Sequence, residues 1–273
     1  MIEYDEHGVR FCTFESFEAY DDVIAFVTTR TGGESRGPYA SLNLGMRSGD
    51  DPAAVVRNRA RVAAITGAPA LVFGRQVHGK RVTAVPEGYS GGAFDDTDAL
   101  ITSATRLPLA VLTADCAAVF LFDPKQRAIG IAHAGWRGTV AGIAALTVVR
   151  MGDEFGSDPA DLVAGIGPSI GPCCYEVGAE VIDAFTDANA EMADEVFVDP
   201  DIASAGSFRA SMNEGRKHLD LWRANELVLV AAGVRESAIE ISRLCTACRR
   251  DLFYSHRGEK GVTGRFAGVI ALR

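Results

Sequence analysis

The chain has 273 residues, of which 48% are hydrophobic and 23% charged, and its formal net charge is −9. These values are typical of a soluble globular protein, and the length accommodates one large α/β domain or two small ones. The negative charge, without a basic tail or a lysine block, argues against a general nucleic-acid binder. The longest apolar stretch, residues 107–122, contains Asp115 and is too short to span a membrane, so no membrane partner is expected.

The cysteine content and the N-terminus indicate the compartment. Six cysteines in a chain of this length are too few for a dense disulfide scaffold. The first ten residues are acidic and lack the apolar core of a secretion signal. We therefore expect a cytoplasmic protein whose reduced thiols are available for metal binding or catalysis.

The first half of the chain predicts one strand, one helix and three short strands, in that order. Residues 23–28 form an apolar run of strand length, followed by a glycine-rich loop. Residues 52–66 predict a helix, because Asp51 is a suitable N-cap and Pro52 suits the first position. Gly67 can end this helix in a left-handed turn. The short strands follow at residues 71–73, 82–85 and 99–101.

The middle of the chain is its most apolar part and predicts buried strands. Continuous apolar runs of strand length indicate them at residues 109–113, 117–122 and 129–132. The remaining elements are helices at 137–151, 175–187 and 214–232 and strands at 162–166 and 266–272. Because strands and helices alternate, we expect an α/β or α+β fold, a layered sandwich with mixed sheets that forms a single domain over residues 1–273.

Polar residues at the ends of the apolar runs are the candidates for chemistry. His78 lies in the motif QVHG, Asp115 and Cys116 in TADC, and His133 opens HAGWRG. Two imidazoles and a thiolate suit Zn²⁺ and leave its fourth position to water, as in catalytic zinc sites. Cys116 with a histidine as base equally suits an activated thiolate nucleophile. Since the spacing matches no zinc-finger pattern, buried core histidines and an inert cysteine also remain open.

Asp115 and the other cysteines have less distinctive surroundings. Asp115 is either a residue that orients a metal-binding histidine or a turn residue. Cys245 and Cys248 have the spacing of half a zinc ribbon, and the only other close pair is Cys173 and Cys174. Because adjacent cysteines chelate one tetrahedral metal poorly, we expect Cys245 and Cys248 to be reduced, buried and free of metal.

Several arginines beside glycine-rich turns are candidates for binding an anion. Arg30 opens the motif RTGGES, Arg137 lies at the start of a predicted helix, and Arg265 ends GVTGR, with Arg257 just before it. Backbone N–H groups at a helix start favour anions, so Arg137 directly after His133 predicts a phosphate site beside the metal. Surface arginines near turns are common, and this is the alternative for each of them. The chain contains no Walker or dinucleotide-binding motif.

Seven motifs in series resemble the YfiH-like laccase-domain family, over residues 23–273. They are SLNLG (41–45), GDDP (49–52), QVHG (76–79), TADC (113–116), HAGWRG (133–138), GPSIGPCCYEV (167–177) and TGR (263–265). The family is variously labelled purine nucleoside phosphorylase, polyphenol oxidase and peptidoglycan editing factor. This chain departs from the family pattern at Ala117 and Ala118, where a proline is expected, and at His256, where tyrosine is commoner.

The resemblance implies a fold, a metal and an activity. The fold is a layered α/β structure similar to toxin-type cysteine hydrolases, with a catalytic zinc on His78, Cys116 and His133. The activities are phosphorolysis of adenosine, inosine and methylthioadenosine and deamination of adenosine, so the expected partners are purine nucleosides and phosphate. The candidate contacts to these substrates are Arg30, Asn43, Arg137 and Arg265. A homodimer is one option for the oligomeric state.

Other functions are weighed against this one. Multicopper laccase chemistry needs about ten histidines, whereas the chain has five. A single copper in place of zinc would allow a phenol oxidase side activity. If Cys116 attacks the substrate instead of holding a metal, the chain is an amide hydrolase acting on cell-wall precursors. A third option is a partner protein without catalysis whose zinc is structural.

Overall fold

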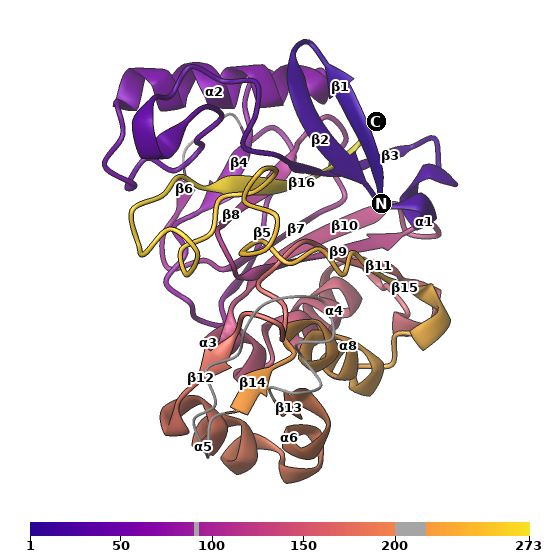
Figure 1. Ribbon diagram of the computed structural model, residues 1–273. Helices are drawn as coiled ribbons and strands as arrows, with labels where there is room; N and C mark the ends of the chain where they lie inside the picture. Colours follow the sequence, from indigo (N-terminus) through magenta and orange to yellow (C-terminus); the bar gives the residue numbers. More distant parts are fainter. Residues whose placement is uncertain (90–92, 200–216) are drawn as a thin grey trace.

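Two β-sheets lie face to face in the computed structural model, which describes residues 1–89, 93–199 and 217–273 (Figure 1). The first sheet has seven strands, antiparallel except where β4 pairs with β8 and with β6. In spatial order they are β1 (Ile2–Glu6), β2 (Val9–Thr13), β3 (Val23–Thr28), β16 (Phe266–Leu272), β8 (Leu109–Thr113), β4 (Val72–Gly74) and β6 (Ala93–Phe94).

The second sheet has six strands, and its centre carries two of the candidate site residues. Its central pairs are antiparallel, while both edge strands pair in parallel. In spatial order its strands are β15 (Ile239–Ile241), β11 (Val163–Ile166), β9 (Ala117–Asp123), β10 (Ala128–Ala134), β7 (Ala99–Thr102) and β5 (Val82–Ala84).

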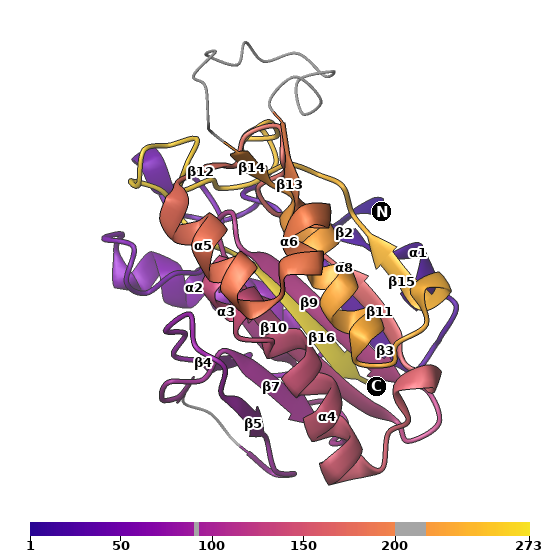
Figure 2. The same ribbon diagram turned by 90° about the horizontal axis from the view of Figure 1, so that it is seen from below.

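Helices cover the outer faces of both sheets. Helix α2 (Pro52–Ile65) lies on the seven-stranded sheet, where its apolar side packs against Phe26 and Val269. Helices α4 (Ile143–Phe155) and α8 (Leu221–Ala231) lie side by side on the six-stranded sheet (Figure 2). The shorter helices are α1 (Glu15–Glu18), α3 (Trp136–Val140), α5 (Ala179–Ala188) and α6 (Ala190–Val196), with 3₁₀ turns at Gly37–Tyr39, Pro159–Asp161 and Glu236–Ala238. A small third sheet of β12 (Glu176–Val177), β14 (Lys217–Leu219) and β13 (Phe197–Val198) lies beside α5 and α6.

The alternation of side chains along β9 explains why the apolar middle of the chain has no visible period. Val119 and Leu121 face the helices, whereas Phe120 and Phe122 face the other sheet, and both faces are buried. Since side chains on alternate positions share a face, His133 continues the intersheet face of Ile131 in β10. The site residues therefore lie at one end of the layer between the two sheets.

The structure confirms the layered α/β arrangement and most predicted elements. The strands at 23–28, 109–113 and 266–272 have the predicted bounds, and the Asp51 carboxylate caps α2 by accepting the Ala53 N–H at 3.0 Å. The short amino-terminal hairpin of β1 and β2 is an addition that the sequence did not predict. No helix in the described ranges is long and apolar enough to cross a membrane.

Three of the predicted helices have wrong bounds: a glycine divides one of them, and strand pairing between distant segments shortens the other two. The helix at 137–151 is divided into α3 and α4, because Gly142 between them adopts a left-handed conformation with φ 75°. The helices at 175–187 and 214–232 start later than predicted, since their first residues pair as β12 and β14 of the third sheet. Residues 214–216 lie outside the described part of the chain.

Candidate active site

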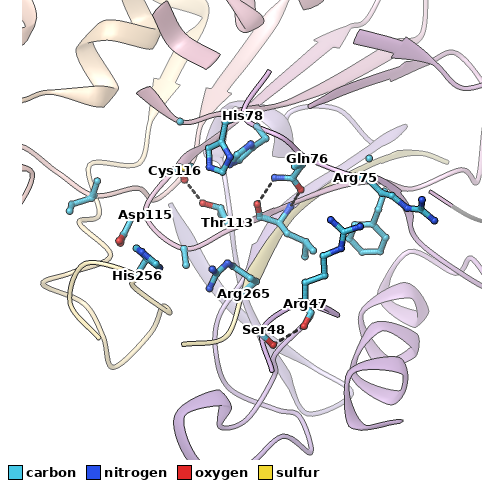
Figure 3. A pocket seen from close by; sticks show the side chains of 18 of the residues that line it. Arg47, Ser48, Arg75, Gln76, His78, Thr113, Asp115, Cys116, His256 and Arg265 are labelled. Carbon is cyan, nitrogen blue, oxygen red and sulfur yellow. Dashed lines mark hydrogen bonds between the residues drawn. The ribbon is translucent and has the colours of Figure 1, made fainter. Parts of the chain in front are cut away.

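His78, Cys116 and His133 converge from three separate segments. His78 follows β4, Cys116 directly precedes β9, and His133 lies near the end of β10. One ligand atom from each lies within 4.8 Å of those of the other two, and the two imidazole rings are 4.8 Å apart at their centroids. Figure 3 shows His78 and Cys116 together at one side of a cavity. His133 is 3% exposed, whereas His78 is open to solvent, so the cluster has one accessible side.

The β9–β10 hairpin positions the thiol of Cys116. The pairs His133 with Ala118 and Ala134 with Ala117 place Gly135 opposite Cys116. A Cβ atom at Gly135 would lie 2.7 Å from the Cys116 sulfur and 3.3 Å from the His78 ring. The first distance is too short for a Cβ atom in a folded protein, so the sulfur would have to move. The glycine of the HAGWRG motif therefore leaves the space that the sulfur and the His78 ring occupy.

Asp98, which the sequence analysis missed, orders both histidines. Its buried carboxylate accepts the backbone N–H groups of Val77, His78 and Gly79 at 2.9–3.0 Å. It also lies 2.9 Å from His133 Nδ1, which leaves Nε2 as the ring nitrogen available to a metal. A carboxylate behind a metal-binding histidine fixes the ring and its tautomer. The only sequence signal was an aspartate directly before the predicted buried strand at 99–101.

The backbone at His78 depends on the same carboxylate. His78 adopts a left-handed conformation with φ 59°, which is uncommon for a residue other than glycine. Three N–H bonds to Asp98 compensate for this conformation, and strained residues of this kind concentrate at functional sites. Gln76 fixes the preceding segment, because its amide donates to the Leu112 carbonyl at 2.7 Å and accepts the Leu112 N–H at 2.8 Å.

The Cys116 thiol and the His133 imidazole shift each other's pKa toward the charged forms. Burial alone raises the pKa of Cys116, but the charge and hydrogen bond of His133, with a further hydrogen bond from His78, lower it to about 6. Burial alone lowers the pKa of His133, but the Cys116 thiolate and the Asp98 carboxylate raise it to about 9. A deprotonated sulfur is the form that binds a metal or attacks an electrophile.

The donor set fits a zinc ion. The three side chains supply two imidazole nitrogens and one thiolate, the ligand types that Zn²⁺ prefers, and their ligand atoms already lie close together. His78 is exposed and lines the cavity, so a metal held by the three residues would be accessible from the cavity. The thiolate and imidazole donors also suit copper.

A cavity of about 840 Å³ opens beside the three residues. Its polar wall is basic: Arg47, Arg59, Arg75, Arg257 and Arg265 line it, although the chain as a whole is acidic. Its apolar wall is formed by Phe73, Leu112, Trp136, Ile170, Tyr175 and Leu221. This size and this combination of surfaces are typical of a site for a small organic molecule that carries negative charge.

Of the four residues proposed to contact substrate, only Arg265 lines the cavity. Asn43 fixes the position of Arg265. Burial lowers the pKa of Arg265, and its guanidinium donates to the carbonyls of Thr263 and Gly264 at 3.1 and 2.8 Å. The buried Asn43 side chain accepts the Arg265 N–H at 2.8 Å and donates to Ser48 at 2.7 Å. Asn43 therefore connects two segments of the cavity wall.

Arg30 and Arg137 lie outside the set of residues that line the cavity. Arg30 pairs with Glu259 at 3.0 Å and stacks on Tyr254. Arg137 is exposed, pairs with Glu180 at 2.9 Å and stacks on Trp136, whose ring lines the cavity. Both stay predictions as substrate contacts.

Asp115 holds the carboxy-terminal loop. Its carboxylate accepts hydrogen bonds from the hydroxyls of Thr246 and Ser255 at 2.7 Å and from the Arg257 N–H at 2.6 Å. These contacts place Arg257 and His256 in the cavity wall. The backbone at Asp115 is left-handed, with φ 94°, so the residue both turns the chain into Cys116 and fixes the loop opposite it.

The other four cysteines outside β2 form a second cluster. The sulfur atoms of Cys173, Cys174, Cys245 and Cys248 all lie within 4.8 Å of one another. Adjacent Cys173 and Cys174 therefore both reach one centre. Cys245 is buried as expected, whereas Cys248 is exposed. The expectation that Cys245 and Cys248 are free of metal stays a prediction. Cys12 lies apart in β2, where burial raises its pKa to about 11.

Comparison with known proteins identifies the family. The family described as multi-copper polyphenol oxidoreductase laccase matches residues 24–273. The purine nucleoside phosphorylase YlmD of Geobacillus stearothermophilus is 39% identical over 259 residues, which cover 92% of this chain and 90% of the relative. Adenosine deaminase RL5, from an unknown prokaryotic organism, is 35% identical over 92% of this chain and 95% of its own.

A solved structure extends the likeness to three dimensions. The crystal structure of the hypothetical protein YfiH of Bacillus licheniformis superposes with a TM-score of 0.87 at 38% sequence identity, and the match covers 98% of each chain. The family match spans nearly the whole chain and includes every segment that supplies the site. The chain belongs to the YfiH/YlmD laccase-domain family.

Proposed function

We propose that this chain is a metal-dependent purine nucleoside enzyme that splits nucleosides with phosphate and also deaminates adenosine. The observation that carries the proposal is the cluster of His78, Cys116 and His133 at the side of a basic cavity large enough for a nucleoside. The names of the relatives, purine nucleoside phosphorylase and adenosine deaminase, support it.

Zinc is the metal that we propose. Three of the five histidines line the cavity, whereas His7 lies in the β1–β2 turn and His218 belongs to the third sheet. Five histidines are about half of what a multicopper oxidase needs, so the copper in the family's description is no guide to the chemistry here. When bound, zinc supplies electrophilic activation and acidifies water at its open position. One copper ion in the same place is the alternative.

For phosphorolysis the chain's own residues provide binding and orientation. Arg265, Arg47 and Arg75 face the cavity and suit phosphate oxygens, because guanidinium groups bind phosphate with charge-assisted hydrogen bonds. Trp136 and Tyr175 offer flat apolar surfaces to a purine. A phosphate oxygen bonds to C1′ as the bond from C1′ to the purine nitrogen breaks. The departing purine keeps the electron pair of that bond and takes a proton from the phosphate or from water.

Deamination is the second activity, and the ligand set favours it. Zinc deaminases bind their metal with histidine and cysteine and replace the amino group of the base with oxygen from water, releasing ammonia. The set of two histidines and one cysteine has the same donor types. Both reactions use a purine nucleoside, so one cavity serves both.

An assay with and without phosphate tests the proposal. Protein purified without added metal should convert adenosine to adenine and ribose 1-phosphate only when phosphate is present, and to inosine and ammonia in either case. The Cys12→Ala variant is a suitable control, because it removes a cysteine in β2, outside the cavity. Absence of both products from metal-loaded protein would refute the proposal.

Replacing Cys116 distinguishes a metal ligand from a nucleophile. Aspartate can coordinate zinc, so Cys116→Asp should keep part of the metal and part of the nucleoside turnover, whereas Cys116→Ser should lose more of both. If the sulfur attacks substrate, both variants are inactive and the wild-type protein forms a covalent adduct that mass spectrometry detects. That outcome would support the amide hydrolase acting on cell-wall precursors.

Four further assignments belong to the proposal. The two packed sheets and their shared core favour a single domain over residues 1–273, and the layered fold favours a relationship to toxin-type cysteine hydrolases.

Six unpaired cysteines are typical of the reducing cytoplasm. A homodimer is the oligomeric state to test by light scattering.

A further inference from the structure

The second cysteine cluster lies at the junction of two loops. Cys173 and Cys174 follow β11, and Cys245 and Cys248 follow β15, which pairs with β11 in parallel. Cys173 and Cys248 are 75 positions apart in sequence. None of the four cysteines is among the described residues that line the cavity. The proposed nucleoside chemistry therefore does not explain the cluster.

The distances between the sulfur atoms fit a tetrahedral metal site. The Cys248 sulfur lies 3.6 Å from that of Cys173 and 3.4 Å from that of Cys174. Four thiolates at about 2.3 Å from one zinc lie about 3.8 Å from one another. A disulfide joins two sulfurs at about 2.05 Å and would leave the other two cysteines unused. We propose that Cys173, Cys174, Cys245 and Cys248 bind one structural zinc ion.

The backbone around the cluster supports this arrangement. Cys245 and Cys248 have the two-residue separation that is common in structural zinc sites, and the Gly171 N–H donates to the Cys245 sulfur at 3.3 Å. The N–H groups of Cys174 and Tyr175 both bond to the Gly171 carbonyl at 3.0 Å. This tight turn explains how two adjacent cysteines reach one centre.

Gly171 itself is required for the loops to meet. A Cβ atom there would lie 2.5 Å from the Trp222 ring and 3.3 Å from Cys245 Cβ. The Thr246 N–H donates to the Ser169 carbonyl at 3.0 Å beside it, so the two loops are in backbone contact. The sulfurs thus converge where the chain has no space for a larger residue.

The proposed zinc would stabilise one wall of the cavity. Tyr175 directly follows the Cys173–Cys174 pair, and Arg257 lies on the loop that Cys245 and Cys248 begin; both line the cavity. Arg257 donates to the Glu176 carbonyl at 3.0 Å and lies over the Tyr175 ring. By joining the two loops, the zinc would keep Tyr175 and Arg257 in contact with each other.

Metal analysis of a variant without the active-site ligands tests the proposal directly. The double variant His78→Ala/His133→Ala should retain about one zinc per chain, where the wild-type protein holds about two. X-ray absorption at the zinc edge of this variant should give four sulfur neighbours at about 2.3 Å. A variant without zinc, or with zinc bound by nitrogen and oxygen, would overturn the proposal, as would iron in place of zinc.

A second variant tests the cross-link. Cys245→Ser/Cys248→Ser should lose one zinc, keep the other, and unfold at a temperature lower by about 10 °C or more. Cys12→Ala is the matched control and should keep both ions. A disulfide within the cluster, detected in unreduced denatured wild-type protein by its mass, would contradict the proposal even if the double serine variant failed to fold. None of these measurements depends on nucleoside turnover, so they remain decisive if the proposed function is wrong.

Discussion

The two candidate metal sites of this chain differ in donors and in access. In the active-site cluster, two histidines and one cysteine end at a cavity of about 840 Å³, and His78 is exposed to it. In the four-cysteine cluster, the sulfurs meet between two loops and outside that cavity. Three ligands with an open position are typical of catalytic zinc, and four cysteines are typical of structural zinc.

The surroundings of Cys116 and Cys245 suit them to different roles. Cys116 is backed by the Asp98 carboxylate through His133, and the space around its sulfur is kept free by Gly135. Cys245 instead accepts a backbone N–H from Gly171 in a loop junction. Asp115 connects the two regions, because it precedes Cys116 and binds Thr246, next to Cys245. We expect catalysis to depend on the first cluster and loop stability on the second.

The largest expected effect separates the two clusters by activity. His133→Ala removes a buried side chain that we propose as a metal ligand. Loss of a residue that only orients such a ligand costs up to roughly 100-fold, so nucleoside turnover should fall by more than this. The unfolding temperature should stay well above that of the variant with serine at positions 245 and 248. Turnover within a few-fold of wild type would show that His133 is no ligand. Metal content and calorimetry on both variants provide the comparison.

A smaller effect is expected for the residue behind the ligands. Asp98→Asn keeps the shape of the side chain but removes the charge that faces His133 and turns one acceptor into a donor beside backbone N–H groups. Metal affinity or turnover should fall roughly 10- to 100-fold. Asp123→Asn is the control, because this buried aspartate accepts N–H groups in the β9–β10 turn. If metal affinity and turnover fell equally in the two variants, Asp98 would have only a structural role.

The sequence predicted the part of the site that lies on strand ends. Cys116 and His133 border the predicted strands at 117–122 and 129–132, which the structure extends to Ala117–Asp123 and Ala128–Ala134, and the family motifs assign His78 beside them. Asp98 could not be predicted, because it reaches the His78 segment across 20 positions and only the pairing of β7 with β10 brings it there. A single polar residue before a strand has no distinguishing pattern.

The four-cysteine cluster was missed for a different reason. Spacing along the chain treats Cys173 and Cys174 as an unsuitable pair, whereas the turn at Gly171 directs both sulfurs to one centre. Likewise, β12 and β14 are too short to give a strand pattern, and pairing between them overrides the helical appearance of residues 175–178 and 217–219. Contacts distant in sequence decide both cases.

A glycine substitution tests how closely the first cluster is packed. Gly135→Ala adds a methyl group 2.7 Å from the Cys116 sulfur, so the sulfur must move. We expect metal affinity of the active-site cluster to fall about 10-fold, while the four-cysteine cluster keeps its ion. Gly178→Ala is the matched control, because a Cβ atom there meets nothing within 4 Å. Wild-type affinity in Gly135→Ala would show that the hairpin yields easily.

The smallest expected effect concerns the anion and compares two arginines of the first region. Arg265 lines the cavity, whereas Arg137 is exposed, pairs with Glu180 and lies outside the cavity lining. Arg265→Met keeps most of the side-chain volume and removes the charge, so the KM for phosphate should rise roughly fivefold, a modest change because Arg47 and Arg75 remain. Arg137→Met should change this KM less, since Arg137 does not line the cavity. Metal content should stay at the wild-type value in both. A larger effect from Arg137 would move the phosphate to the start of α3, beside His133, and would favour the anion site that the sequence predicts there.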